Sequence, residues 1–107
     1  MDFEVVSSSD LLEPKFNGGG VEKFYEFLIK EFDKSTLSKP GTILISFVVN
    51  SFGELKEIKV LEFPNIEAAS EIIRVLNLSP KWESAKRAGK PFSTEIKIPL
   101  KFYFKTN

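Results

Sequence analysis

The chain has 107 residues, of which 42% are hydrophobic and 28% charged, and its formal net charge is zero, as is typical of a single globular domain. It contains no cysteine and no histidine, which excludes disulfides, thiolate chemistry and the commonest general base and metal ligand. We therefore expect a protein that is not an enzyme and that needs no cofactor or metal. Seven basic and two acidic residues fall in the segment 79–107, too few for a nucleic-acid-binding surface, so no nucleic-acid partner is expected.

The first elements in chain order are an arm, a glycine-rich break and a helix. Residues 1–12 are assigned to an N-terminal arm with a short apolar burst at Phe3–Val6, and residues 13–107 to the domain. The run Gly18–Gly20 breaks regular structure. After it, apolar residues recur every three or four positions, which predicts an amphipathic helix over 21–32.

A strand hairpin and a second helix follow. Residues 42–50 are rich in β-branched and aromatic side chains and predict a buried strand, which a turn at Gly53 joins to a more exposed strand over 55–63. Asn65 is a favourable N-cap for a helix that ends near Leu78. Glu67 and Glu71 fall opposite the apolar stripe of this helix, so we expect both in water, where neither suits acid–base catalysis.

The last predicted element is a long strand from Phe92 to Phe104. Its even-numbered residues are apolar apart from one threonine, and its odd-numbered residues are mostly polar, as in a half-buried strand. Pro99 indicates that this strand lies at an edge of the sheet, because proline cannot donate a ladder hydrogen bond. Trp82, in the irregular stretch before it, is expected to pack in the core rather than anchor a partner.

The order helix, strand, strand, helix, strand predicts an α+β fold of two layers, with two helices packed on one face of a three-stranded antiparallel sheet. If the final strand pairs with the first one, the sheet order is 2-1-3. The free edge of the final strand is then the best candidate for function, because its unpaired backbone groups suit an incoming extended peptide. A second copy of the chain or the N-terminal arm at 3–6 are the other occupants considered.

The chain also resembles a known family, the C-terminal domain of the energy transducer TonB, in the version common in Bacteroidetes. The resemblance covers about residues 13–104 and lies in an ordered set of short motifs, which include Pro-x-Trp, Gly-Lys-Pro and a closing Ile-Pro-Leu-x-Phe. The residues that carry its structural motifs are Phe16, Gly18, Gly19, Gly53, Pro80, Trp82, Gly89 and Pro91.

The resemblance implies a non-catalytic periplasmic domain that binds a peptide of an outer-membrane TonB-dependent receptor by strand addition and transmits energy for transport. It implies inner-membrane motor proteins as partners only if the full-length protein has an N-terminal membrane helix. The alternative is a stand-alone structural or regulatory domain that pairs its final strands in a homodimer. The residues expected to meet the partner are Glu95, Lys97, Pro99, Lys101 and Tyr103.

Overall fold

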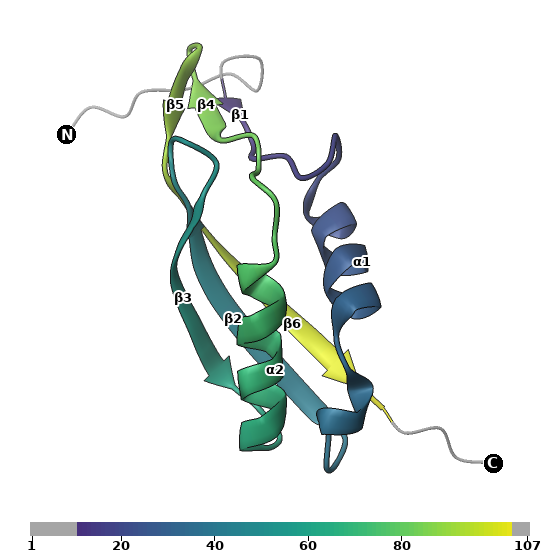
Figure 1. The fold of residues 1–107 in the computed structure, drawn as a ribbon. Helices are drawn as coiled ribbons and strands as arrows, with labels where there is room; N and C mark the ends of the chain where they lie inside the picture. The colour runs from purple at the N-terminus through teal and green to yellow at the C-terminus, as the bar shows by residue number, and fades with distance from the viewer. Residues whose placement is uncertain (1–10, 104–107) are drawn as a thin grey trace.

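The computed structural model describes residues 11–103 and has the predicted α+β architecture (Figure 1). This part of the chain contains two α-helices, a short 3-10 turn, η1, and strands before, between and after them. The elements in order are β1 (Leu11–Leu12), α1 (Val21–Glu31), η1 (Lys34–Thr36), β2 (Gly41–Val49), β3 (Leu55–Glu62), α2 (Ile66–Asn77), β4 (Ala85–Arg87), β5 (Lys90–Phe92) and β6 (Thr94–Phe102).

The main sheet is antiparallel and has the strand order β3-β2-β6. The final strand therefore pairs with the first strand of the hairpin, and the predicted 2-1-3 order is confirmed. Both helices lie on the same face of this sheet, so the molecule has two layers, as Figure 1 shows. The opposite face of the sheet carries the polar side chains of β6.

The core lies between the helices and the sheet and follows from two sequence periods. Alternate side chains of β2 and β6 point towards the helices, while residues three or four apart on α1 and α2 point back. Each large apolar side chain fully buried in this way contributes about 1.5–3 kcal/mol. The largest fully buried side chains are Phe24, Leu28, Ile43, Ile45, Phe47, Val49, Ile72, Val75, Leu76 and Leu100.

A second, small sheet of order β1-β4-β5 extends from one end of the main sheet (Figure 1). It corrects the expectation of one continuous strand from Phe92, because β5 ends at Phe92 and β6 begins at Thr94. The tight turn at Ala88 and Gly89, both with positive φ, folds β5 back onto β4. Phe92 consequently pairs with Ala85 in the small sheet and is exposed instead of joining the core.

The start of the chain contributes to the same small sheet. Leu11 and Leu12, which the sequence analysis placed in the arm, pair with Arg87 and Lys86 of β4. The apolar burst at 3–6 lies outside the described residues. The β1 segment thus lies against β4 and does not pair with β6.

The second helix differs in two details from its predicted form. The spacing of Ile66, Ala69, Ile72, Ile73 and Leu76 predicts one apolar stripe on this helix. Ile66 and Ile73 are nevertheless exposed, because the buried face of α2 is turned towards α1 as well as the sheet. Asn65 makes no side-chain cap hydrogen bond. Its amide nitrogen instead donates to the carbonyl oxygen of Thr36 at 2.7 Å, and its amide oxygen accepts from the N–H of Ser38, which ties the η1 segment to the start of α2.

Candidate functional site: the outer edge of strand β6

The five residues predicted to meet a partner lie together along β6. Ile96, Ile98, Leu100 and Phe102 alternate with them and are buried against the helices, so the odd-numbered side chains project from the other face. Tyr103 follows the strand directly and is 81% exposed. The exposed residues are Glu95, Lys97, Pro99, Lys101 and Tyr103.

One hydrogen bond shows which residues of β2 direct their backbone N–H and C=O groups towards β3 and which towards β6. It runs from the N–H of Asn50 to the carbonyl oxygen of Glu54, at 2.9 Å. Asn50, which directly follows β2, therefore directs its backbone N–H and C=O towards β3, and so do the even-numbered residues of β2. In an antiparallel sheet successive residues alternate in this direction, so the odd-numbered residues of β2 bond to β6. Their partners in β6 are even-numbered, as in the pair Ile43–Leu100.

The odd-numbered residues of β6 consequently direct their backbone groups away from β2, towards the outer edge. Pro99, which pairs with Leu44, is one of these residues and removes no hydrogen bond from the sheet. Lys97 and Lys101 present both an N–H and a C=O to the edge, whereas Pro99 presents a C=O alone. The same residues thus carry the side chains that we expect to determine specificity for a partner and the backbone groups that we expect to bind it.

This edge is regular and unpaired within residues 11–103. Strand β6 pairs with β2 over nine consecutive residues, from Thr94 to Phe102, without a register shift, and it has no second neighbour in the described part of the chain. The other edge strand, β3, has two register shifts against β2, and Glu57 within it has φ of +51°. Bulges of this kind protect an edge from further pairing. Of the two edges, β6 is the better template for an added strand.

Helix α1 provides an apolar flank beside this edge. Val21, Tyr25 and Ile29 recur every four residues on one side of the helix, and the first two are 41% and 39% exposed. Ile29 is partly buried against the core. An open pocket of about 370 Å³ continues this stripe, and it is lined by Tyr25, Ile29, Lys34, Leu37, Lys101, Phe102 and Tyr103.

The electrostatics of the pocket are one-sided. Its charged lining residues are two lysines, Lys34 and Lys101, with no carboxylate among them. The one ion pair within residues 11–103 joins Glu71 to Arg74, so neither lysine has an acidic partner at ion-pair distance there. The pocket and the adjoining edge therefore have a positive charge that is available to a partner.

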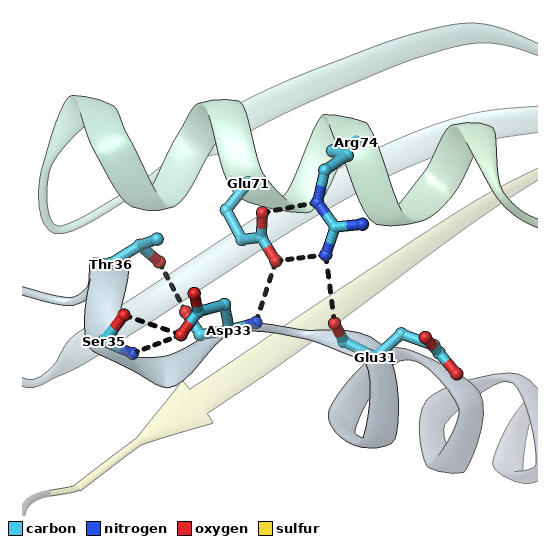
Figure 2. Close-up of polar contacts among 6 residues, drawn as sticks. All are labelled: Glu31, Asp33, Ser35, Thr36, Glu71 and Arg74. Atoms are coloured by element: carbon cyan, nitrogen blue, oxygen red, sulfur yellow. Dashed lines mark hydrogen bonds and ion pairs between the residues drawn. The ribbon is translucent and has the colours of Figure 1, made fainter.

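The Glu71–Arg74 pair joins α2 to the segment between α1 and η1 and holds that segment in place (Figure 2). Glu71 is only 9% exposed, which corrects the expectation that it lies in water. Its carboxylate accepts the N–H of Asp33 at 2.8 Å, and Arg74 donates to the carbonyl oxygen of Glu31. Hydrogen bonds from Arg74 and from the Asp33 backbone lower the pKa of Glu71, so it is ionised at neutral pH.

Other carboxylates with a shifted pKa are also shifted downwards. Hydrogen bonds from nearby backbone or side-chain donors lower the pKa of Glu22, Glu54 and Glu67. A lowered pKa makes a carboxylate a weaker base and so less suited to acid–base catalysis. The hydrogen bonds that lower it stabilise the turn or helix end in which each group lies. Within residues 11–103, no group of three or more acidic side chains is placed to hold a metal ion.

The residues that carry the structural motifs lie in three places: around the aromatic cluster of Trp82, at the contact between Gly53 and Trp82, and in the β4–β5 hairpin. Trp82 is buried, as expected, and packs with Phe16, Phe24 and Phe47, at ring-centroid distances from Trp82 of 5.5, 4.8 and 5.8 Å respectively. Phe16 also closes a turn with Gly19 through two backbone hydrogen bonds of 2.9 Å.

The backbone N–H of Trp82 also donates to the carbonyl oxygen of Gly53, which joins the β2–β3 turn to Trp82. Gly18 lies in the Phe16–Gly19 turn with φ of +80°, and Pro80 precedes Trp82. Gly89 and Pro91 belong to the β4–β5 hairpin, away from the edge of β6.

Sequence reasoning missed the pocket residues Tyr25, Ile29, Lys34 and Leu37, although the width of the apolar stripe on α1 is a signal that could have found the first two.

Comparison with models of protein families, with curated proteins and with solved structures gave no match to this chain. The helices of residues 11–103 include none that is long and apolar enough to cross a membrane.

Proposed function

We propose that the protein is a non-catalytic binding domain that captures an extended peptide as an additional strand on β6. The observation that carries the proposal is the regular outer edge of β6, whose nine paired residues direct alternate backbone groups away from the sheet. Strand addition uses such groups for affinity and the neighbouring side chains for specificity. In this proposal Glu95, Lys97 and Lys101 do both.

The partner we propose is the N-terminal peptide of an outer-membrane TonB-dependent receptor, on the basis of the family resemblance. The domain then works in the periplasm and transmits force to the receptor when it is tethered to the inner membrane. An added strand suits this task because several parallel hydrogen bonds share the load along one strand. The observation that favours a peptide over a second copy is Pro99, because two paired β6 strands would each lack an N–H at this position, whereas a peptide without proline meets only one such gap.

An isotope-labelled sample of the domain, titrated with receptor peptides, tests the proposal through hydrogen exchange of backbone amides. The amides of Glu95, Lys97 and Lys101 should become protected from exchange when the peptide binds. The amides of Ile96 and Ile98 already bond to β2 in our assignment, so their protection should change little. Peptide binding that leaves the outward amides unprotected would contradict strand addition at this edge.

Sedimentation of the free domain tests the alternative of a strand-paired homodimer. We expect a monomer at micromolar concentration, because a proline in the middle of the edge removes one N–H from each strand of the pair. A stable dimer that protects the same outward amides would favour self-pairing over peptide capture.

A further inference from the structure

The pocket between α1 and the end of β6 lies where a captured strand would place its side chains. It is lined by residues of α1, of the η1 segment and of β6, and by none from β2, β3 or α2. It therefore opens on the side of β6 away from β2. This is also the side to which Lys101 directs its backbone groups.

The geometry of an added strand divides its side chains into two sets. Because strands in one sheet share their pleat, every second residue of the newcomer points to the face that the helices cover. On that face it meets Tyr25 and Ile29, whose exposed apolar surface has no other cover among the described residues. An apolar side chain there extends the core by one strand and removes this surface from water.

The charge of the lining restricts the remaining positions. Lys34 and Lys101 line the pocket, Lys97 lies four residues before Lys101 on the same edge, and none of the three forms an ion pair within residues 11–103. Acidic residues in the captured strand complement these lysines, whereas basic residues meet like charge. Glu95, at the far end of the edge, is the one exposed acidic side chain of β6.

We infer that the partner segment is an extended strand that places an apolar side chain in the Tyr25–Ile29 pocket and carries acidic residues beside Lys97 and Lys101. This inference rests on the proposed strand addition and specifies the chemistry of the strand. It makes this end of the edge the specificity-determining site, with Lys97 and Lys101 selecting charge on the open face and Ile29 selecting an apolar residue on the helix face.

Three capped octapeptides are suitable probes. The first alternates valine with glutamate, the second valine with lysine, and the third serine with glutamate. The valine–glutamate peptide should bind about tenfold more tightly than the serine–glutamate peptide, since a buried valine side chain gains that much by leaving water. Its affinity should also exceed that of the valine–lysine peptide by about tenfold at low salt, and this difference in affinity should shrink as ionic strength rises.

Variants of the domain make the assignment specific to the pocket. Ile29→Ser should weaken binding of the valine–glutamate peptide several-fold, whereas Ile29→Val should restore most of it. Ile73→Ser is the matched control, because Ile73 is a partly exposed isoleucine on α2 that does not line the pocket, and it should leave binding unchanged. The double variant Lys97→Glu/Lys101→Glu should reverse the preference towards the valine–lysine peptide.

The outcomes separate this inference from the proposed function. If the valine–glutamate and valine–lysine peptides protect the β6 amides with equal affinity, the charge selection is wrong while strand addition stands. If the serine–glutamate peptide binds as tightly as the valine–glutamate peptide, or if Ile73→Ser weakens binding as much as Ile29→Ser, the apolar pocket is wrong. If peptide binding protects no outward β6 amide, the proposed function itself fails.

Discussion

The backbone N–H of Trp82 donates to the carbonyl oxygen of Gly53 at 2.8 Å, and this bond joins the β2–β3 turn to the segment after α2. Gly53 has φ of +82°, and a Cβ added to it would lie 1.9 Å from the carbonyl oxygen of Trp82. Both the backbone conformation and the lack of space therefore require glycine. The contact holds Trp82 in the aromatic cluster with Phe24 and Phe47.

Gly53→Ala should destabilise the domain more than the same change at Gly89. The two glycines have nearly equal positive φ, but a Cβ at Gly89 meets nothing within 4 Å. Gly89→Ala thus measures the conformational cost alone, about 1–2 kcal/mol. Gly53→Ala adds the clash with Trp82, which should raise the loss by at least about 2 kcal/mol, measured by urea unfolding. Equal losses would show that the Gly53–Trp82 contact is easily rearranged.

Trp82→Ala should lower the free energy of unfolding by about 3–5 kcal/mol, because it leaves a large cavity among buried aromatic rings. Trp82 is 4% exposed and contacts residues from α1 and β2, so the loss affects both layers. Tyr103→Ala is the control, since this exposed aromatic should cost no more than about 0.5 kcal/mol. Circular dichroism is the appropriate measurement, because Trp82 is the chain's single tryptophan. A loss below 1 kcal/mol at Trp82 would contradict a core role.

Glu71→Gln should change how stability depends on pH. The pKa of Glu71 is lowered in the folded state, chiefly by the hydrogen bond from Arg74. Its contribution is therefore complete above the pKa of the unfolded chain, about 4.3, and is lost as pH falls through the lower folded pKa. We expect the variant to lose about 1–2 kcal/mol at neutral pH and to show a shallower acid limb.

Thermal unfolding of the Glu71→Gln variant and the parent between pH 2 and pH 7 checks this prediction. Glu67→Gln is the control on the same helix, because its carboxylate is exposed and its hydrogen bonds are local, so water screens them and the acid limb should change less than for Glu71→Gln. Parallel pH curves for Glu71→Gln and the parent would show that the buried carboxylate does not contribute to acid sensitivity.

The sequence predicts those parts of the fold in which a local period decides the structure. The alternation over residues 94–102 gives the buried and exposed faces of β6, and Pro99 indicates its edge position. Glu71 could not be placed in this way, because the N–H that it accepts belongs to Asp33, 38 residues away in the sequence. The helical period puts Glu71 on a polar face, and only the packing of α1 beside α2 buries it.

The small sheet and the pocket lie outside what a local sequence period can predict. Strands β4 and β5 have three residues each, which is too short for an alternating pattern to stand out. Tyr25 and Ile29 fit an apolar helix stripe, but which of its members reach the core depends on where α1 crosses β6. The pocket brings together three separate segments of the chain, so no local pattern signals it.

Strand addition is tested most directly by the affinity of receptor peptides for Lys97→Pro and Lys97→Ala. Lys97 has the same parity as Pro99, so proline there removes an outward N–H and leaves the bonds to β2 intact. We predict that Lys97→Pro keeps a cooperative unfolding transition and binds at least about tenfold more weakly, from the lost hydrogen bond and the blocked approach, whereas Lys97→Ala stays within about threefold of the parent. Equal affinities for a folded Lys97→Pro variant and Lys97→Ala would contradict backbone pairing along the edge of β6.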